Sequence, residues 1–118
     1  MPRFLTIIRA DERNAPTQEP TPELAQRMGE LYEEITKAGV MLDTAALAPS
    51  SEATRLTWTD GELSRIDGPF TETKEVIGGY SLIQAKDKAE ALYWAQRFGE
   101  IQGLHENLVV EVREIVEG

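Results

Sequence analysis

The order in which extended and helical patterns alternate along the chain most constrains its fold. Residues 4–8 are aromatic and β-branched and predict a strand. Residues 21–23, Thr-Pro-Glu, then open a helix with a side-chain cap, a proline in its first turn and an early acidic residue. Apolar residues recur at three and four positions up to Ala38, and Gly39 ends the helix. Because residues 40–42 are again apolar and extended, the first third of the chain reads as strand, helix and strand.

The last third of the chain has the same order. Residues 80–85 predict a strand, and Asp87 with Glu90 three positions later opens a helix as a capping box. We expect Gly99 to stop this helix, and residues 108–115 to form the final strand. The stripe that we expect this helix to bury consists of Ala91, Leu92, Ala95 and Phe98, with Trp94 beside it or at a contact between subunits.

A β-hairpin is expected between these two units. Asp60-Gly61 separates residues 54–59 from residues 62–66, and this dipeptide favours a tight two-residue turn. The whole order is strand, helix, strand, hairpin, strand, helix, strand. We therefore predict one α+β domain over residues 1–118, a ferredoxin-like βαββαβ sandwich with an added hairpin. Helices on one face of its sheet would leave the other face to be covered by a second subunit.

Two connections complete the chain order. Residues 11–20 hold Asn14 and two prolines, and their length favours a surface loop, with a flap over a site as the alternative. Residues 45–51 read as a loose passage rich in alanine, proline and serine.

Composition excludes several classes of function. Twenty-one acidic residues against twelve basic ones give a net charge of −9, which disfavours binding to nucleic acid or to an anionic membrane. The chain has no cysteine, so thiolate catalysis, disulfides and cysteine-based metal sites are excluded. No apolar run is long enough to cross a membrane, and no secretory signal is recognisable. We expect a cytoplasmic protein.

The segment from residue 65 to residue 80 is the densest in turn-forming and charged residues. Asp67-Gly68-Pro69 favours a turn, with Gly68 free to adopt a positive φ. Gly78-Gly79 allows close backbone approach to another strand or to a ligand, just before the strand that Tyr80 opens. Between these two breaks the chain carries two hydroxyls, two carboxylates and one ammonium group, at residues 71–75.

This segment resembles the signature of the YCII-related proteins, in the branch named for its Asp-Gly-Pro-Phe motif. The resemblance rests on residues 67–70, the Thr-Glu-Thr-Lys-Glu run at 71–75 and Gly-Gly-Tyr at 78–80, and it extends along nearly the whole chain. It implies a ferredoxin-like fold that pairs into a dimeric α/β barrel, hence a homodimer. Genes of this branch often lie beside sigma-factor genes, which points to regulation or stress response.

The chain departs from its relatives in one catalytic feature. Related YCII-type proteins are thought to use a histidine at the start of the first helix, together with an aspartate; Glu23 stands about there in this chain. The sole histidine, His105, lies beside Glu106 in a polar connector and reads as a surface residue. We expect no metal and, because the phosphate-binding glycine motifs are missing, no nucleotide cofactor.

The remaining candidates for chemistry lie in the central segment. Asp67, turned inward, is a candidate general base, and Lys74 is a candidate anchor for negative charge. Either Glu72 or Glu75 would hold Lys74 in place. The structural alternative is that Asp67 caps a turn, Phe70 fills the core and Lys74 is solvated. The candidate ligand pocket comprises Gly68, Pro69, Phe70, Thr71, Glu75, Gly79 and Tyr80.

Two functions follow from these residues. The first is a cofactor-independent enzyme acting on a small molecule, with Asp67 beside an aromatic pocket formed by Trp58, Phe70 and Tyr80. The second is a non-catalytic module that binds a ligand or a partner protein. Arg9 and Arg113 lie on neighbouring strands and are expected either to pair with Glu111, to be solvated, or to receive an anionic ligand.

Overall fold

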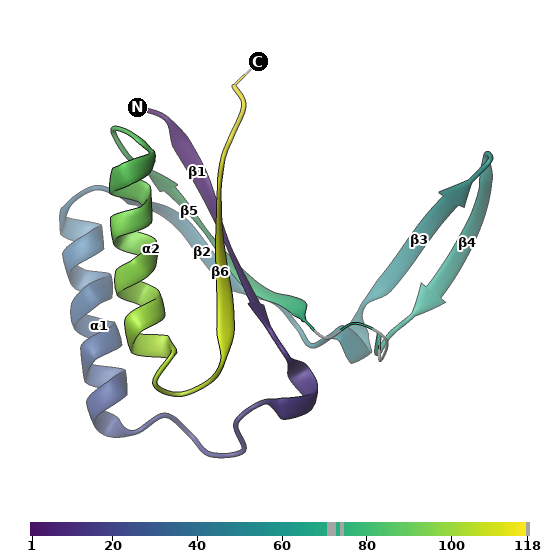
Figure 1. Cartoon of the computed structure of the whole chain (residues 1–118), viewed down its shortest axis with the longest axis horizontal. Helices are drawn as coiled ribbons and strands as arrows, with labels where there is room; N and C mark the ends of the chain where they lie inside the picture. The colour runs from purple at the N-terminus through teal and green to yellow at the C-terminus, as the bar shows by residue number, and fades with distance from the viewer. Residues whose placement is uncertain (71–72, 74, 118) are drawn as a thin grey trace.

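A four-stranded antiparallel sheet covered by two helices on one face forms the body of the molecule (Figure 1). The computed structural model describes residues 1–70, 73 and 75–117. The strands of the sheet, in the order β2-β5-β1-β6, are β2 (Met41–Ala46), β5 (Val76–Gln84), β1 (Arg3–Ala10) and β6 (Leu108–Glu114). The helices are α1 (Pro22–Lys37) and α2 (Lys88–Gln102), and short 3₁₀ turns occupy Glu12–Asn14 and Ser50–Glu52.

The strand order confirms the ferredoxin-like prediction. The units β1-α1-β2 and β5-α2-β6 interlock, so that β5 lies between β1 and β2, and β1 lies between β5 and β6. Each strand is antiparallel to its neighbours, which is the split βαβ arrangement. Both crossover helices consequently reach the same face of the sheet.

Both helices begin at the predicted caps. The Thr21 hydroxyl accepts a hydrogen bond from the Leu24 amide at 3.2 Å, and the Asp87 carboxylate accepts one from the Glu90 amide at 2.9 Å. The helices are joined across their exposed side by Arg97, whose guanidinium donates to both carboxylate oxygens of Glu34 at 2.6 and 2.8 Å.

The predicted end of α2 is wrong. The helix continues through Gly99 to Gln102, and Gly103 follows it. A helical glycine costs only about 1 kcal/mol, and the extra turn buries Ile101 in the core. The buried stripe also differs from the prediction, since Leu92 is exposed and Trp94 is buried instead.

Strands β2 and β5 are longer than predicted. Ala45 and Ala46 belong to β2 rather than to a loop, and Gly78 and Gly79 lie within β5 rather than before it. The two strands approach closely here, because a Cβ at Gly79 would lie 2.9 Å from the Ala45 carbonyl oxygen. Gly79 therefore allows the close backbone approach that was predicted, here to another strand, although it lies within β5 rather than before it.

The core lies between the sheet and the two helices. Phe4 is only 1% exposed and pairs across strands with Ile83, which is 2% exposed. Their neighbours in the core cluster are Leu31, Ile35, Val40, Ala85, Ala91, Trp94 and Ile101.

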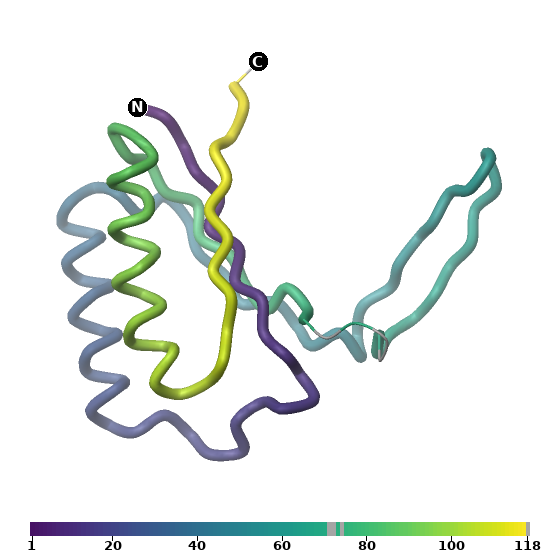
Figure 2. The backbone as a smooth tube through the Cα atoms, in the orientation of Figure 1, coloured from purple at the N-terminus to yellow at the C-terminus, as the bar shows by residue number. Residues whose placement is uncertain are grey.

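The predicted hairpin is present and projects away from the body as an arm (Figures 1 and 2). It consists of β3 (Thr54–Thr59) and β4 (Glu62–Asp67), which pair with each other and with no other described strand. Asp60 and Gly61 both have positive φ, at 52° and 80°, as the tight turn requires. The apolar side chains on one side of the arm are exposed: Leu56, Trp58 and Leu63.

The face of the sheet opposite the helices is uncovered by any other described element (Figure 1). Its apolar residues form cross-strand pairs on that face, among them Leu5 with Leu82 and Ile7 with Tyr80. Glu111 forms ion pairs with Arg9 and Arg113 on this face, which was one of the predicted alternatives: its carboxylate lies 3.4 Å from Arg9 and 3.9 Å from Arg113. None of the described helices is both long and apolar enough for a membrane span.

Candidate functional site

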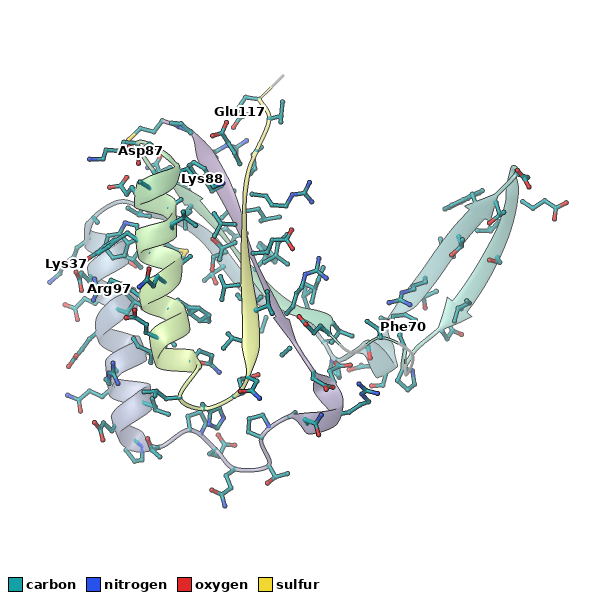
Figure 3. All side chains as sticks on the ribbon, in the orientation of Figure 1. Lys37, Phe70, Asp87, Lys88, Arg97 and Glu117 are labelled. Carbon is teal, nitrogen blue, oxygen red and sulfur yellow. The ribbon has the colours of Figure 1, made fainter. Side chains whose placement is uncertain are left out.

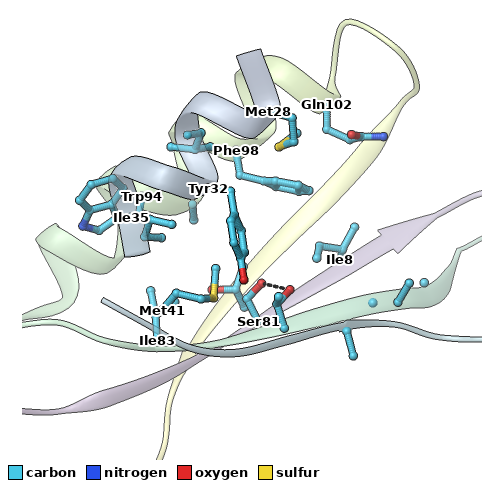
Figure 4. A pocket seen from close by; sticks show the side chains of 18 of the residues that line it. Ile8, Met28, Tyr32, Ile35, Met41, Ser81, Ile83, Trp94, Phe98 and Gln102 are labelled. Carbon is cyan, nitrogen blue, oxygen red and sulfur yellow. Dashed lines mark hydrogen bonds between the residues drawn. The ribbon is translucent and has the colours of Figure 1, made fainter. Parts of the chain in front are cut away.

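The main cavity of the described structure lies between the helices and the sheet (Figure 4). Its volume is about 510 Å³, within the range of small-molecule sites. The side chains that form its walls are mainly apolar: Met28, Leu31 and Ile35 from α1, Trp94, Ala95 and Phe98 from α2, and Ile8, Met41 and Ile83 from the sheet.

Small residues on the floor of the sheet create this space. At the end of the sheet distant from Phe4, the lining positions are occupied by Ala10, Ala45, Ala46, Gly78 and Gly79. These residues bring almost no side-chain volume to the gap between the layers. Where the floor instead carries Phe4 and Ile83, the two layers are closely packed. The cavity is therefore a consequence of residue size along neighbouring strands.

A row of hydroxyl groups crosses the cavity floor. Thr6, Ser81 and Thr44 are cross-strand neighbours on β1, β5 and β2. The hydroxyls of Thr44 and Ser81 are 3.0 Å apart, and the Thr44 hydroxyl also donates to the Tyr80 carbonyl at 3.2 Å. The Tyr32 hydroxyl points from α1 toward Ser81 (Figure 4). We call Thr6, Ser81 and Thr44 the hydroxyl row.

Two buried polar atoms that belong to cavity-lining residues have no hydrogen-bond partner in the described structure. They are the Thr6 hydroxyl and the Trp94 indole N–H, on side chains that are 5% and 8% exposed. Leaving a buried donor unpaired costs about 1–3 kcal/mol. The cavity thus has apolar walls, and two of its lining residues each carry a buried polar atom that the described structure leaves unpaired.

Charge is scarce in the cavity lining. Among the described lining residues the one ionisable acid or base is Glu106, apart from the phenol of Tyr32. The Gln102 side-chain amide donates to the Glu106 carboxylate at 2.7 Å. No lysine or arginine of the described chain lines the cavity.

The predicted general base, Asp67, ends β4 at the foot of the arm. Its side chain is 67% exposed and accepts hydrogen bonds from the Thr54 hydroxyl at 2.8 Å and the Arg65 guanidinium at 3.3 Å. It is not among the lining residues of the main cavity. Its role as a base stays a prediction, as does that of Lys74 and Glu72, which lie outside the described residues together with Thr71.

The next residues of the motif anchor the foot of the arm (Figure 3). The Gly68 amide donates to the Ala53 carbonyl at 2.8 Å, and Phe70 is buried beneath the Arg55 guanidinium, 3.7 Å from the ring centroid. Gly68 does not have the positive φ that was expected. Glycine is required there because a Cβ would lie 1.8 Å from the Ser50 carbonyl oxygen.

A second pocket, of about 410 Å³, lies at this foot and contains part of the predicted site. Phe70 and Glu75 line it, together with Arg9 and Arg55; Gly68 and Pro69 do not. The loop before α1 also reaches this region, because the Glu12 carboxylate accepts hydrogen bonds from the Ser50 amide and hydroxyl.

Gly79 and Tyr80 lie apart from the motif. Gly79 lines the main cavity, whereas Tyr80 is on the open face of the sheet and donates to the Asp43 carboxylate at 3.2 Å. This hydrogen bond, reinforced by the negative charge of Asp43, raises the pKa of the Tyr80 hydroxyl above its usual value. Tyr80 is therefore a hydrogen-bond donor rather than a base at neutral pH.

The predicted aromatic pocket of Trp58, Phe70 and Tyr80 is wrong. Trp58 is exposed on the arm, Phe70 is buried at its foot and Tyr80 is on the sheet. Sequence reasoning missed the hydroxyl row. Its one local signal is Thr6, a hydroxyl inside the apolar run of the first strand, but its partners come from distant strands.

Metal-ligating side chains are dispersed in the part of the chain that the structure describes. No three histidine, cysteine or acidic residues lie close enough there to hold an ion.

The fold and its cavities define a small α+β domain of ferredoxin-like topology. The chain belongs to the YCII-related domain family, whose model matches residues 3–117. It is also similar to "Uncharacterized protein R00369" of Rhizobium meliloti (strain 1021), with 40% identity over 60 residues. That similarity covers 51% of this chain and 48% of the relative's length, so the chain matches about half of that protein.

Proposed function

We propose that this protein binds a small, mainly apolar molecule in the cavity between its helices and its sheet, without a cofactor. The observation that carries this proposal is the 510 Å³ space with apolar walls and two unpaired polar atoms among its lining residues. A cavity of this kind buries apolar ligand surface and orients the ligand through a few polar groups. The binding is non-catalytic in this proposal, because the candidate base Asp67 is exposed on the arm.

Filling the cavity tests this proposal. The neutral fluorophore N-phenyl-1-naphthylamine gains fluorescence when it enters an apolar site. We expect the wild-type protein to bind it, and Ile8→Trp to weaken binding about tenfold or more, because Ile8 projects into the cavity (Figure 4). Leu92→Trp is the matched control, since Leu92 is exposed on α2 and is not a lining residue. Equal binding by wild type and Ile8→Trp would contradict the proposal.

A second candidate function is a cofactor-independent enzyme at the foot of the arm. The pocket there is lined by Arg9, Arg55 and Glu75 together with Phe70 of the Asp-Gly-Pro-Phe motif, so an anionic substrate bound there would meet guanidinium groups. In this proposal Asp67 is the base, and Lys74 and Glu72 assist it. A detected activity that is unchanged in Asp67→Asn would rule this version out.

We further propose that the protein is a homodimer that pairs through the open face of the sheet. The apolar pairs on this face favour self-association despite a net charge of −9, because the arginines on its strands are paired: Arg9 and Arg113 with Glu111, and Arg3 with Glu117. We expect light scattering at micromolar concentration to give about twice 13.2 kDa. Ile7→Glu on this face should give the monomer mass, and a monomeric wild type would contradict the proposal.

The proposed link to sigma-factor regulation is a separate alternative, in which the protein binds a partner protein.

A further inference from the structure

We propose that the ligand of the helix–sheet cavity is uncharged and carries a carbonyl or hydroxyl oxygen that hydrogen-bonds to the hydroxyl row. This inference rests on the proposed ligand-binding function and names the chemical class of the ligand. Three observations support it: the position of the hydroxyl row, the hydrogen-bonding capacity that the row leaves unused, and the near absence of charge in the cavity lining.

The row is the polar part of an otherwise apolar floor. Thr6 and Ser81 are direct cross-strand partners, and Ser81 and Thr44 are the next such pair. Directly paired residues lie on the same face of a sheet, so the three hydroxyl-bearing side chains are in line across three strands. On one side of the row the floor is Phe4, Ile83 and Met41, and on the other it is Ile8, Gly79 and Ala46.

The hydrogen bonds within the row leave the Thr6 hydroxyl and an acceptor site on the Ser81 oxygen unused. Because the Thr44 hydroxyl donates to the Tyr80 carbonyl, the Ser81 hydroxyl is the donor in its contact with Thr44. The Ser81 oxygen then still accepts. The Thr6 hydroxyl is fully buried and has no partner in the described structure. In this proposal the Thr6 side chain turns toward the cavity when the ligand binds, and its hydroxyl then offers its proton. A ligand carbonyl accepts from Thr6, and a ligand hydroxyl can both accept from Thr6 and donate to Ser81.

The lining disfavours a charged ligand. An anion would be buried without a lysine or arginine beside it, and Glu106 would repel it. A cation would meet one carboxylate, that of Glu106, which already accepts a hydrogen bond from Gln102 at the C-terminal end of α2. The Thr6 hydroxyl can therefore donate to an uncharged ligand oxygen without the free-energy cost of burying an unpaired charge.

Four probes of nearly the same shape separate these contributions. Acetophenone has the carbonyl oxygen, 1-phenylethanol replaces it with a hydroxyl, α-methylstyrene replaces it with a CH₂ group, and benzoate adds a negative charge. Dissociation constants are measured by titration of ¹⁵N-labelled protein for the wild type, Thr6→Val, Ser81→Ala and the matched control Thr57→Val. Thr57 carries an exposed hydroxyl on the arm, and valine has almost the shape of threonine.

We expect Thr6→Val to weaken acetophenone relative to α-methylstyrene by about fivefold, as for one hydrogen bond, and Thr57→Val to leave the ratio unchanged. Ser81→Ala should weaken 1-phenylethanol more than acetophenone, each measured relative to α-methylstyrene. The reason is that the hydroxyl of 1-phenylethanol can also donate to Ser81. Thr6→Val should keep or raise the unfolding temperature, because it removes an unpartnered buried hydroxyl. That result shows that the variant is folded.

Each other outcome overturns a different statement. A ratio that is unchanged in both Thr6→Val and Ser81→Ala overturns the hydroxyl-row inference, while binding of both probes in the cavity would still support the proposed function. Benzoate binding as tightly as acetophenone overturns the requirement for an uncharged ligand. If no probe shifts the resonances of cavity residues, the inference and the proposed function both fail.

Discussion

Phe4→Ala is expected to lower the free energy of unfolding by about 3–5 kcal/mol, the usual range for removing a buried phenylalanine. Phe4 is 1% exposed and is the largest fully buried side chain of the described structure. Its ring pairs with Ile83 at the closed end of the helix–sheet interface, so its loss leaves a void that rigid strands and helices cannot fill. Urea unfolding followed by far-UV circular dichroism measures the change.

The matched control is Leu92→Ala, on the exposed side of α2. Leu92 is 45% exposed, and alanine is a good helix former, so the expected change is within about 0.5 kcal/mol. A loss of less than about 1 kcal/mol in Phe4→Ala would contradict the placement of this ring in the core.

Gly68→Ala is expected to displace the foot of the arm and to cost about 1–3 kcal/mol. The added Cβ would lie 1.8 Å from the Ser50 carbonyl oxygen and 2.8 Å from its carbonyl carbon. Because both atoms are backbone, the two segments must separate, which breaks the hydrogen bond from the amide at position 68 to Ala53. Hydrogen exchange of that amide reports the local effect, and urea unfolding reports the total.

Gly29→Ala gives a control of opposite sign. Gly29 is an exposed helical glycine of α1 with no atom within 4 Å of an added Cβ. Alanine there should stabilise the protein by about 0.5–1 kcal/mol. If Gly68→Ala preserved both the stability and the protection of that amide, the close approach to Ser50 would be refuted.

The element order could be predicted from sequence because its signals are local. Thr21 and Asp87 cap their helices as expected, and Asp60-Gly61 forms the tight turn. The errors occur where tertiary packing overrides a local preference. The helix continues past Gly99 because the extra turn buries Ile101. Gly79 lies within a strand because the absence of a side chain lets the backbone of Ala45 pack against it.

The candidate site was much less predictable. Charged and turn-forming residues concentrate in the central segment, which draws attention to Asp67, but that carboxylate is exposed and bonded to Thr54 and Arg65. The hydroxyl row is made by strand register, and Thr6 and Ser81 are far apart in sequence. The glycine at position 68 was expected to serve a turn, whereas its function in the structure is close packing of backbone against Ser50.

The most direct test of the proposed binding site uses the two tryptophans of the chain as internal reporters. Trp94 lines the helix–sheet cavity, and Trp58 is 63% exposed on the arm. ¹⁵N-labelled protein is titrated with N-phenyl-1-naphthylamine, and both indole N–H resonances are followed. The account predicts that the Trp94 resonance and the amides of Thr6 and Ser81 shift while the Trp58 resonance stays in place. Shifts of Trp58 alone, or no shift at any of these positions, would contradict ligand binding in the cavity.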